Sequence, residues 1–515
     1  MIVKGQIVRG GVSELLLRKK QDVDVELGEL LVVEDGSRRV LCQVSDLSYG
    51  SQISSQNLEY ISGIDLEEDF DTQFMDGNLR HYVLCHINPV LVIGRDGKTR
   101  GPSVIPPLFS YAREVGIDDF SFLPRSGMQL GLLRSGKETL DIPLCLDAVD
   151  VASHHVLITG TTGKGKSVLM KNILWEMTRE AGVASLVFDP HDEYYGNGHK
   201  RKGLKDTDVS GRISYYTPSH PPVGQSTFKI NVSLLRPEHF SLVGFSSAQR
   251  QALQSYFKTY GKKWVEAVLM ERSLNDEYND ATLQVVKRRL SQLLQLQRKQ
   301  GSIIESSVFS LSAGASTISD IADALEKART VIVDTSPFSG TIELLLANLI
   351  TSEVFNRYRQ YKLESIQGKP VVSVVLEEAP RVLGRDVLEH GPNVFASIAR
   401  EGRKFGVGLV AITQMPSLIP KELLANMNTK VILGTEMSQE RAAIIDSASH
   451  DLSKDSRTIA SLSKGEALIS SNFSPLALPT TVPFFDEEVE KFKKKTSKTS
   501  QEVSATKKFS GIDME

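Results

Sequence analysis

Residues 160–167 have the composition and spacing of a phosphate-binding loop. Glycines there let backbone N–H groups approach phosphate oxygens closely, because no side chain intervenes. Lys166 is expected to reach the β- and γ-phosphates, and the Ser167 hydroxyl to bind Mg²⁺. The chain has no Asn-Lys-x-Asp signature of guanine selectivity, so ATP is the expected nucleotide. The residues expected to contact it are Gly160, Thr162, Gly163, Lys164, Gly165, Lys166 and Ser167.

Two adjacent carboxylates follow the apolar run 371–376 and could serve as the acidic partner of such a loop. Glu377 is expected to hold Mg²⁺ through water, and Glu378 to orient and polarise the attacking water. Aspartate is more familiar at the first position, so Glu377 is longer by one methylene. The alternative interpretation is a strand that runs into the acidic start of a helix, where the helix dipole favours carboxylates.

Two further polar residues end apolar runs. Asp189 follows residues 184–188, and ligands of open parallel sheets bind beyond the carboxyl ends of the strands. Asp189 is therefore expected to support Mg²⁺ or the attacking water, with a structural turn beside Pro190 as the alternative. Gln414 follows residues 409–413 and is expected to sense the γ-phosphate through a hydrogen bond.

A cationic segment at residues 399–406 is a candidate for an arginine that acts on the site of a neighbouring subunit. Arg403 is the first choice and Arg400 the second. Arg403 also falls at a predicted helix end, where any cation is favoured, and this is the competing explanation.

Positive charge is balanced over the whole chain, with 60 Lys and Arg against 63 Asp and Glu and a formal net charge of −3. Any DNA-binding surface must therefore be local. The glycine-containing loop 196–203 carries Lys200, Arg201 and Lys202, which are candidates for phosphate contacts without sequence reading. An ordinary exposed loop explains these residues equally well.

The elements that must position these residues form an alternating α/β pattern. Short apolar runs, typical of parallel strands buried on both faces, lie at 155–158, 184–188, 331–333, 371–376 and 408–412. Leu283, Val286 and Leu290 recur at helical spacing within a long insertion. The sequence therefore predicts a RecA-like P-loop ATPase core with a helical insertion.

The first part of the chain has strand-like alternation and glycine turns such as Asp35-Gly36 and Asp96-Gly97, which favour a small β-barrel. The Lys-, Ser- and Thr-rich end is expected to be disordered. The predicted domains are the barrel at 1–145, the first part of the core at 146–235, the helical subdomain at 236–325, the second part of the core with an extended brace at 326–490, and the tail at 491–515.

Three cysteines without paired spacing suggest neither a disulfide framework nor a zinc site. The N-terminus lacks the pattern of a signal peptide, and no apolar run approaches the length of a membrane span. The sequence therefore predicts a cytoplasmic protein without a membrane partner.

The assembled motifs resemble the HerA family, archaeal members of the HerA/FtsK group of hexameric DNA-pumping ATPases. The resemblance covers nearly the whole chain, from Lys4–Val8 through the phosphate-binding loop, 188–194, 229–232, 376–379 and 400–406 to Thr413-Gln414. It departs from the family at Lys164, where a small residue is usual, and at Asp192, where glycine is usual.

Membership would imply a homohexamer with double-stranded DNA in its channel, ATP sites between subunits, and association with the nucleoid. It would place Lys166, Ser167, Glu377, Glu378, Gln414 and Arg403 on the family's catalytic positions. It would also imply that the barrel mediates assembly and docks a NurA-type nuclease for DNA end resection in double-strand-break repair and homologous recombination.

Three other functions fit parts of the sequence. Another DNA pump of the same group is one, although such pumps are commonly anchored in a membrane. An ATP-binding ring scaffold without motor activity is a second, against which the Glu377-Glu378 pair argues. A small-molecule kinase is the third, and it would be indifferent to DNA.

Overall fold

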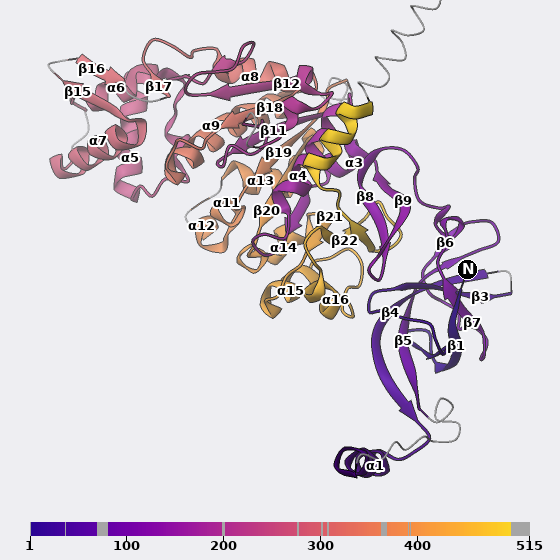
Figure 1. The fold of residues 1–515 in the computed structure, drawn as a ribbon. Helices are drawn as coiled ribbons and strands as arrows, with labels where there is room; N and C mark the ends of the chain where they lie inside the picture. The colour runs from indigo at the N-terminus through magenta and orange to yellow at the C-terminus, as the bar shows by residue number, and fades with distance from the viewer. Residues whose placement is uncertain are drawn as a thin grey trace, which may run out of the picture.

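The N-terminal strands close into a six-stranded barrel in the computed structural model, which describes residues 2–36, 38–68, 81–197, 201–274, 278–299, 302–305, 308–361, 368–389, 391 and 393–495 (Figure 1). The strands follow the order β2-β1-β7-β3-β4-β5, and β5 pairs back with β2. They are β1 (Val3–Gly10), β2 (Leu15–Lys19), β3 (Leu30–Asp35), β4 (Arg38–Ser51), β5 (His81–Ile93) and β7 (Tyr111–Glu114), with the short β6 (Thr99–Arg100) outside the ring on β5. Alternate side chains such as Leu17, Leu31 and Val40 fill the interior, as the period of two requires.

A twelve-stranded sheet forms the core of the rest of the chain, in the order β13-β12-β18-β11-β19-β20-β10-β21-β22-β23-β8-β9. The strands from β13 to β21 are parallel, and those from β22 to β9 join by antiparallel pairing. They are β8 (Met128–Ser135), β9 (Glu138–Leu146), β10 (Val156–Thr159), β11 (Val183–Asp189), β12 (Ile213–Thr217), β13 (Ser226–Thr227), β18 (Thr330–Asp334), β19 (Val371–Leu376), β20 (Val407–Thr413), β21 (Thr429–Leu433), β22 (Glu466–Ser471) and β23 (Leu478–Thr481).

Helices cover both faces of this sheet, so its central strands are apolar throughout. Leu157 enters one core together with side chains of α9, whereas its neighbours Val156 and Ile158 enter another with those of α4. The helices of this part are α3 (Ala148–Ser153), α4 (Lys166–Arg179), α8 (Thr317–Leu325), α9 (Gly340–Gln360), α11 (Pro380–Leu383), α12 (Arg385–Glu389), α13 (Val394–Glu401), α14 (Lys421–Ala425), α15 (Ser438–Ile445) and α16 (Ser456–Ser461). The predicted fold class, a RecA-like α/β core preceded by a small barrel, is confirmed.

The insertion between β12 and β18 is largely helical. It contains α5 (Ser247–Tyr260), α6 (Trp264–Leu269), α7 (Asp280–Leu294), the pair β14 (Ile230–Asn231) and β17 (Phe309–Ser310), and the hairpin of β15 (Leu296–Lys299) and β16 (Ser302–Glu305). Val286 and Leu290 are buried on the apolar face of α7, as the spacing predicts. On its other face, Lys287 forms an ion pair with Glu271.

Three segments differ from the expectations. The barrel ends at Glu114, and β8 and β9, which lie within the predicted range 1–145, extend the core sheet through β23. Pro479 lies in β23 between β22 and β8, although proline is unfavourable in a central strand and the segment was expected only as an extended brace. Residues 485–495 are helical, including the first five of the predicted tail. Phe485 and Phe492 of this helix pack edge-on against one Trp175 ring, which explains its order. Residues 496–515 lie outside the described part.

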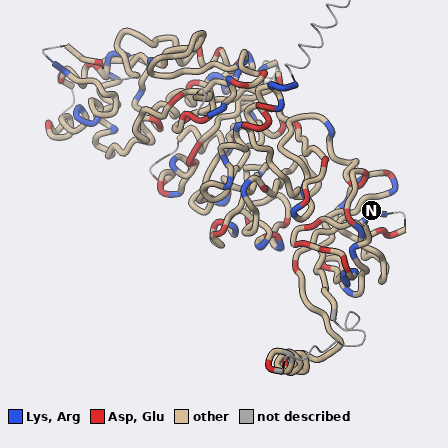
Figure 2. The backbone as a smooth tube through the Cα atoms, viewed as in Figure 1, with Lys and Arg blue, Asp and Glu red and all other residues tan. Residues whose placement is uncertain are grey.

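Acidic and basic residues are distributed over all parts of the chain (Figure 2). None of the helices in the described ranges is both long enough and apolar enough to cross a membrane.

Candidate nucleotide site

The phosphate-binding loop connects β10 to α4 and wraps around its own lysine. The Lys166 Nζ donates hydrogen bonds to the backbone oxygens of Gly160 (2.9 Å) and Thr161 (3.1 Å). Gly163 (φ +80°) and Gly165 (φ +107°) have left-handed backbones, which favour glycine. The loop therefore has the conformation that its glycines predict, with the amine held inside it.

The acidic pair follows β19, which lies two strands from β10 with β20 between them. Burial lowers the pKa of Lys166, and the nearby carboxylates of Glu378 and Glu377 partly offset this effect. The fold therefore brings the amine within electrostatic range of both predicted carboxylates.

Gln414 follows β20, the strand between β10 and β19, and its side chain connects the phosphate-binding loop to the acidic pair. The Thr162 hydroxyl donates a hydrogen bond to Gln414 Oε1 (2.7 Å), and Gln414 Nε2 donates to Glu378 Oε1 at a longer 3.5 Å. A side chain that contacts both the loop and the acidic pair is suitably placed to respond to a γ-phosphate between them.

Glu378 has a left-handed backbone (φ +51°). For a residue other than glycine this conformation costs about 1–2 kcal/mol. Such strain gathers at functional sites, where the surrounding structure enforces it. The chain continues from Glu378 into a turn held by the Ala379 N–H, which donates to the Ile412 oxygen (3.0 Å). This link to β20 fixes where the strained residue lies.

Tyr194 contacts the other carboxylate, and the sequence did not identify it. Its side chain is 1% exposed, and its hydroxyl donates a hydrogen bond to Glu377 Oε1. Burial raises the pKa of Glu377, and the hydrogen bond from Tyr194 opposes that rise. Its only signal in the sequence was its place in the 188–194 segment.

Asp189 holds the turn that presents Tyr194. Its buried carboxylate accepts three backbone N–H groups, from His191 (3.3 Å), Glu193 (3.1 Å) and Tyr194 (2.9 Å). Burial raises the pKa of Asp189 to about 6, against the effect of these hydrogen bonds. The contacts are those of the structural turn that was the alternative interpretation, so direct support of Mg²⁺ or water by Asp189 remains a prediction.

The two departures from the family pattern have clear surroundings. The Lys164 Nζ donates a hydrogen bond to the Leu462 oxygen (3.0 Å) and lies 3.9 Å from a Glu436 carboxylate oxygen. Asp192 has φ +50°, a backbone that glycine adopts without strain. The Asp192 carboxylate accepts hydrogen bonds from Tyr215 (3.3 Å) and Asn197 (3.1 Å).

Arg403 lies in the short helix η7 (Gly402–Phe405), directly before β20, and is exposed. Gln414 directly follows the same seven-residue strand, so roughly 23 Å of strand separates them. Arg403 is thus remote from the site of its own subunit. Arg400, at the end of α13, is also exposed.

The candidate DNA-binding cations are compensated by carboxylates. Arg201 forms an ion pair with Glu193 (3.1 Å), and Lys202 forms one with Glu490. Lys200 lies outside the described residues. The DNA-binding role of this loop remains a prediction.

The donor set suits magnesium rather than a metal held by protein alone. No group of three or more His, Cys, Asp or Glu that could hold a metal ion occurs in the part of the chain that the structure describes. Mg²⁺ is usually held by one or two carboxylates, water and the phosphates of its nucleotide. That the Ser167 hydroxyl and the Glu377 carboxylate are the protein oxygens of such a site remains a prediction.

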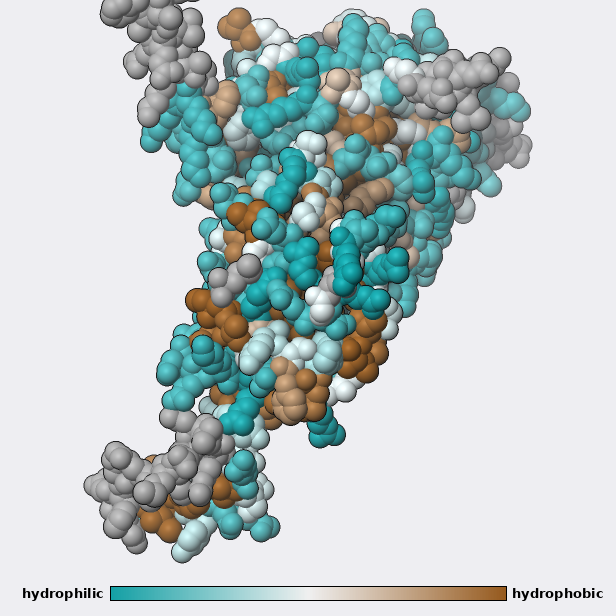
Figure 3. Space-filling view, turned by 90° about the vertical axis from the view of Figure 1, so that its right-hand side faces the viewer, coloured by the Kyte–Doolittle hydropathy of each residue, from teal (hydrophilic) through white to brown (hydrophobic). Residues whose placement is uncertain are grey.

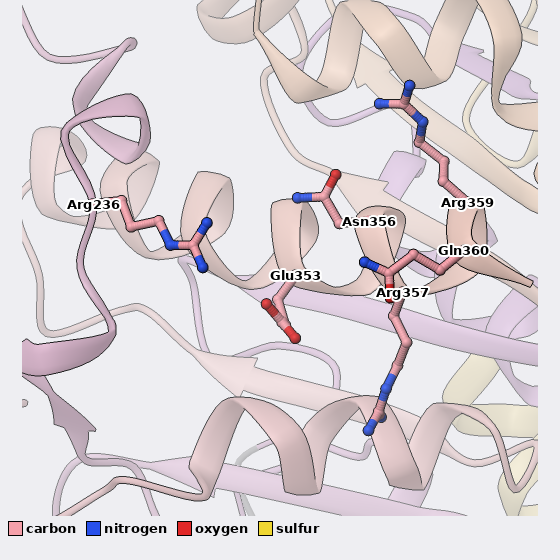
Figure 4. A pocket seen from close by; sticks show the side chains of 6 residues that line it. All are labelled: Arg236, Glu353, Asn356, Arg357, Arg359 and Gln360. Carbon is pink, nitrogen blue, oxygen red and sulfur yellow. The ribbon is translucent and has the colours of Figure 1, made fainter. Parts of the chain in front are cut away.

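A polar cavity of about 570 Å³ elsewhere in the molecule shares no residue with this site (Figure 4). It is lined by Arg236, Glu353, Asn356, Arg357, Arg359 and Gln360. Arg236 points toward Glu353, whereas Arg357 and Arg359 point away from each other. Arg357 donates a hydrogen bond to Asp323 (2.6 Å). The arginines of this cavity therefore do not converge on one ligand.

Comparisons with known proteins agree with the motifs. Residues 128–354 match the family model described as "Helicase HerA, central domain". The matched range begins at Met128, the first residue of β8. The DNA double-strand break repair helicase HerA of Sulfurisphaera tokodaii is 23% identical over 89% of this chain and 88% of its own length. The protein of that name from Saccharolobus solfataricus is 22% identical over 94% of this chain and 93% of its own length. The structure of VirB4 of Thermoanaerobacter pseudethanolicus aligns with 70% of this chain and 97% of its own, at 14% identity and a TM-score of 0.47.

Proposed function

We propose that this chain, a HerA-family protein by the sequence matches above, is an ATP-driven translocase and helicase of double-stranded DNA. In this proposal the working form is a homohexameric ring with DNA in its channel and an ATP site at each subunit boundary. The ring acts with a NurA-type nuclease in DNA end resection during double-strand-break repair.

The observation that carries the proposal is the joining of loop and acidic pair at one edge of the sheet. Gln414 contacts both Thr162 and Glu378, and Lys166 is within electrostatic range of Glu377 and Glu378. A site that only binds nucleotide has no need for a strained carboxylate opposite the lysine. This arrangement supports hydrolysis over a passive scaffold.

Each side chain has a distinct role in the proposed hydrolysis. Lys166 would bind the phosphates, and Ser167 and Glu377 would hold a Mg²⁺ ion, which would supply Lewis-acid neutralisation of the phosphate charge. Glu378 orients the attacking water and withdraws its proton. Gln414 reports the state of the γ-phosphate to β20, whose other end carries Arg403.

The position of Arg403 supports a ring. An exposed arginine at the opposite edge of the sheet cannot serve its own site but suits the site of an adjacent subunit. Hydrolysis in one subunit would then be felt by the next through β20, which is how we propose that ATP use is coupled to movement.

A Glu378→Gln substitution tests the proposal. The amide keeps the shape of the side chain but cannot take a proton, so ATP should still bind while turnover falls by about 10²- to 10⁴-fold. Glu389→Gln, at an exposed position of α12, is the matched control and should hydrolyse ATP normally. Turnover is measured with and without linear duplex DNA.

Two results would separate the alternatives. Unchanged turnover in Glu378→Gln would favour a ring scaffold. Wild-type turnover that ignores duplex DNA, together with no DNA binding at low salt, would count against a translocase and for a small-molecule kinase. Stimulation of a purified NurA-type nuclease by the wild-type ring, but not by Glu378→Gln, is the result expected for end resection.

A further inference from the structure

A short arm extends from the barrel and ends in an isolated helix. Pairing of β5 with β2 ends at Arg18↔Leu84, whereas β4 and β5 remain paired out to Ser51↔His81. The helix α1 (Ser55–Glu68) follows β4 and stands apart from the rest of the chain (Figure 1). All its described side chains are exposed or half-exposed. A 14-residue helix without packing is marginal in water, so α1 requires a partner surface.

The exposed residues of the arm indicate the chemistry of that partner. Tyr49 is 93% exposed, Tyr60 71% and Leu66 79%. Large apolar side chains exposed together mark interaction sites. Glu59 and Glu67 of α1 are also exposed, and no basic residue occurs in the helix. The partner surface should therefore offer apolar contacts within a basic rim.

The barrel itself carries such a surface. A hollow of about 530 Å³ lies between the ends of β1, β2, β5 and β7. Its charged lining residues are Arg18, Lys19, Lys20 and Asp22. Tyr82 and Tyr111 supply aromatic rings, and the Arg18 guanidinium lies 4.1 Å from the Tyr82 ring centre. Figure 3 shows hydrophobic side chains gathered in patches between the core and the α1 end.

We infer that α1 of one copy docks into this basic hollow on the barrel of the next copy, so that each subunit clasps its neighbour. Tyr60 and Leu66 would contact the tyrosine rings, and Glu59 and Glu67 would face the lysines. None of the residues lining the hollow comes from α1 of the same copy. A contact between two different surfaces of identical chains is heterologous and can repeat around a ring. The inference rests on the proposed ring, and it adds the contact that holds the barrels together.

Cross-linking of introduced cysteines tests the contact. Ser62, exposed on α1, and Gln21, exposed at the hollow, are both changed to cysteine in one full-length chain, which leaves the contacting side chains intact. The native thiols do not interfere, because Cys42, Cys85 and Cys145 are all buried. A short bismaleimide should convert Ser62→Cys/Gln21→Cys into a ladder of covalent multimers up to the full ring. Each single variant should give no ladder.

Light scattering on the same samples separates the two proposals. A ring of normal mass without a ladder, or cross-links only within one chain, overturns the docking of α1 and leaves the motor untouched. A chain that stays a single subunit at every concentration overturns both. Loss of nuclease binding by Tyr60→Ser, with a normal ring and no ladder from Ser62→Cys/Gln21→Cys, would also overturn the inference and assign α1 to the nuclease.

A charge exchange gives an independent test. Glu67→Lys and Lys20→Glu should each weaken ring assembly about two- to five-fold at low salt, the range for exposed ion pairs. The double variant Glu67→Lys/Lys20→Glu restores opposite charges and should recover assembly. Equal weakening by the double variant and the singles would contradict a direct contact. Both residues lie outside the nucleotide site, so ATP binding should be unchanged.

Discussion

Replacement of Tyr194 by phenylalanine removes one hydroxyl from the nucleotide site and leaves the ring in place. The Tyr194 side chain is 1% exposed, and its hydroxyl is a hydrogen-bond donor to Glu377. Phenylalanine fills the same space, so the fold should persist. The Glu377 carboxylate then loses the donor that stabilises its charged form.

The size of the effect follows from that single contact. A hydrogen bond to a charged group contributes about 1.5–3 kcal/mol, and 1.4 kcal/mol is a factor of ten. Loss of a residue that orients a metal-binding side chain typically weakens metal binding about 10- to 100-fold. Because Glu377 is half-buried and water can replace part of the lost bond, we expect Tyr194→Phe to raise the Mg²⁺ concentration needed for half-maximal ATPase about tenfold.

The pH dependence has a definite sign. Burial already raises the pKa of Glu377, and Tyr194 opposes that rise, so Tyr194→Phe should raise the pKa further. Since ionised Glu377 is the form that holds Mg²⁺, the acid limb of the rate profile should move to higher pH. At alkaline pH the variant should approach the wild type.

Tyr195→Phe is the matched control. Tyr195 is buried and stacks on Tyr215 with ring centres 4.0 Å apart, but its hydroxyl is not part of the nucleotide site. ATPase rates are measured against Mg²⁺ concentration at several pH values for both variants. If Tyr194→Phe matches Tyr195→Phe in Mg²⁺ requirement and acid limb, Tyr194 does not position Glu377.

Other substitutions test the remaining contacts. Lys166→Ala should abolish ATP retention on a filter assay, and mixing its subunits with Arg403→Ala subunits should restore ATPase if Arg403 acts across the boundary; no restoration would refute that role. The folded-state pKa of Asp189 is raised to about 6, so the folded state binds the proton more tightly and this group's contribution to stability falls as pH rises from about 4 to 6. Asp189→Asn should remove this dependence, seen in melting temperature against pH. Gly408→Ala should destabilise the core by about 3 kcal/mol or more, measured by thermal unfolding, because its added carbon would lie 1.8 Å from the Ala152 oxygen.

The parts of the site that local sequence determines were predictable. An apolar run, a glycine loop and a helix start fix where Lys166 and Ser167 lie, because consecutive residues of one motif need no tertiary information. The ends of parallel strands meet at one edge of a sheet, which is why Glu378 and Gln414 could be placed near the loop before their contact was known.

Residues whose roles depend on contacts between distant segments were not predictable in this way. Tyr194 is 183 positions from Glu377, and its role depends on a turn closed by the Asp189 carboxylate. The direction of Lys164 depends likewise on the Leu462 oxygen, 298 positions away. The helix at 485–495 did have a signal, since Phe485, Val489 and Phe492 recur at helical spacing, but the adjacent Lys-rich composition concealed it.

Pro479 shows why a general rule failed at one position. Proline lacks an N–H and so is unfavourable in a central strand. Pro479 pairs with Leu468 on β22, whereas β23 pairs with β8 through Thr480 and Thr481. The proline therefore lies where β23 has a partner on one side only, and the next two residues supply the pairing on the other. Proline still cannot donate a backbone hydrogen bond to a neighbouring strand. A four-residue strand can nevertheless include a proline and lie inside the sheet, when its other residues make the pairing on the second side.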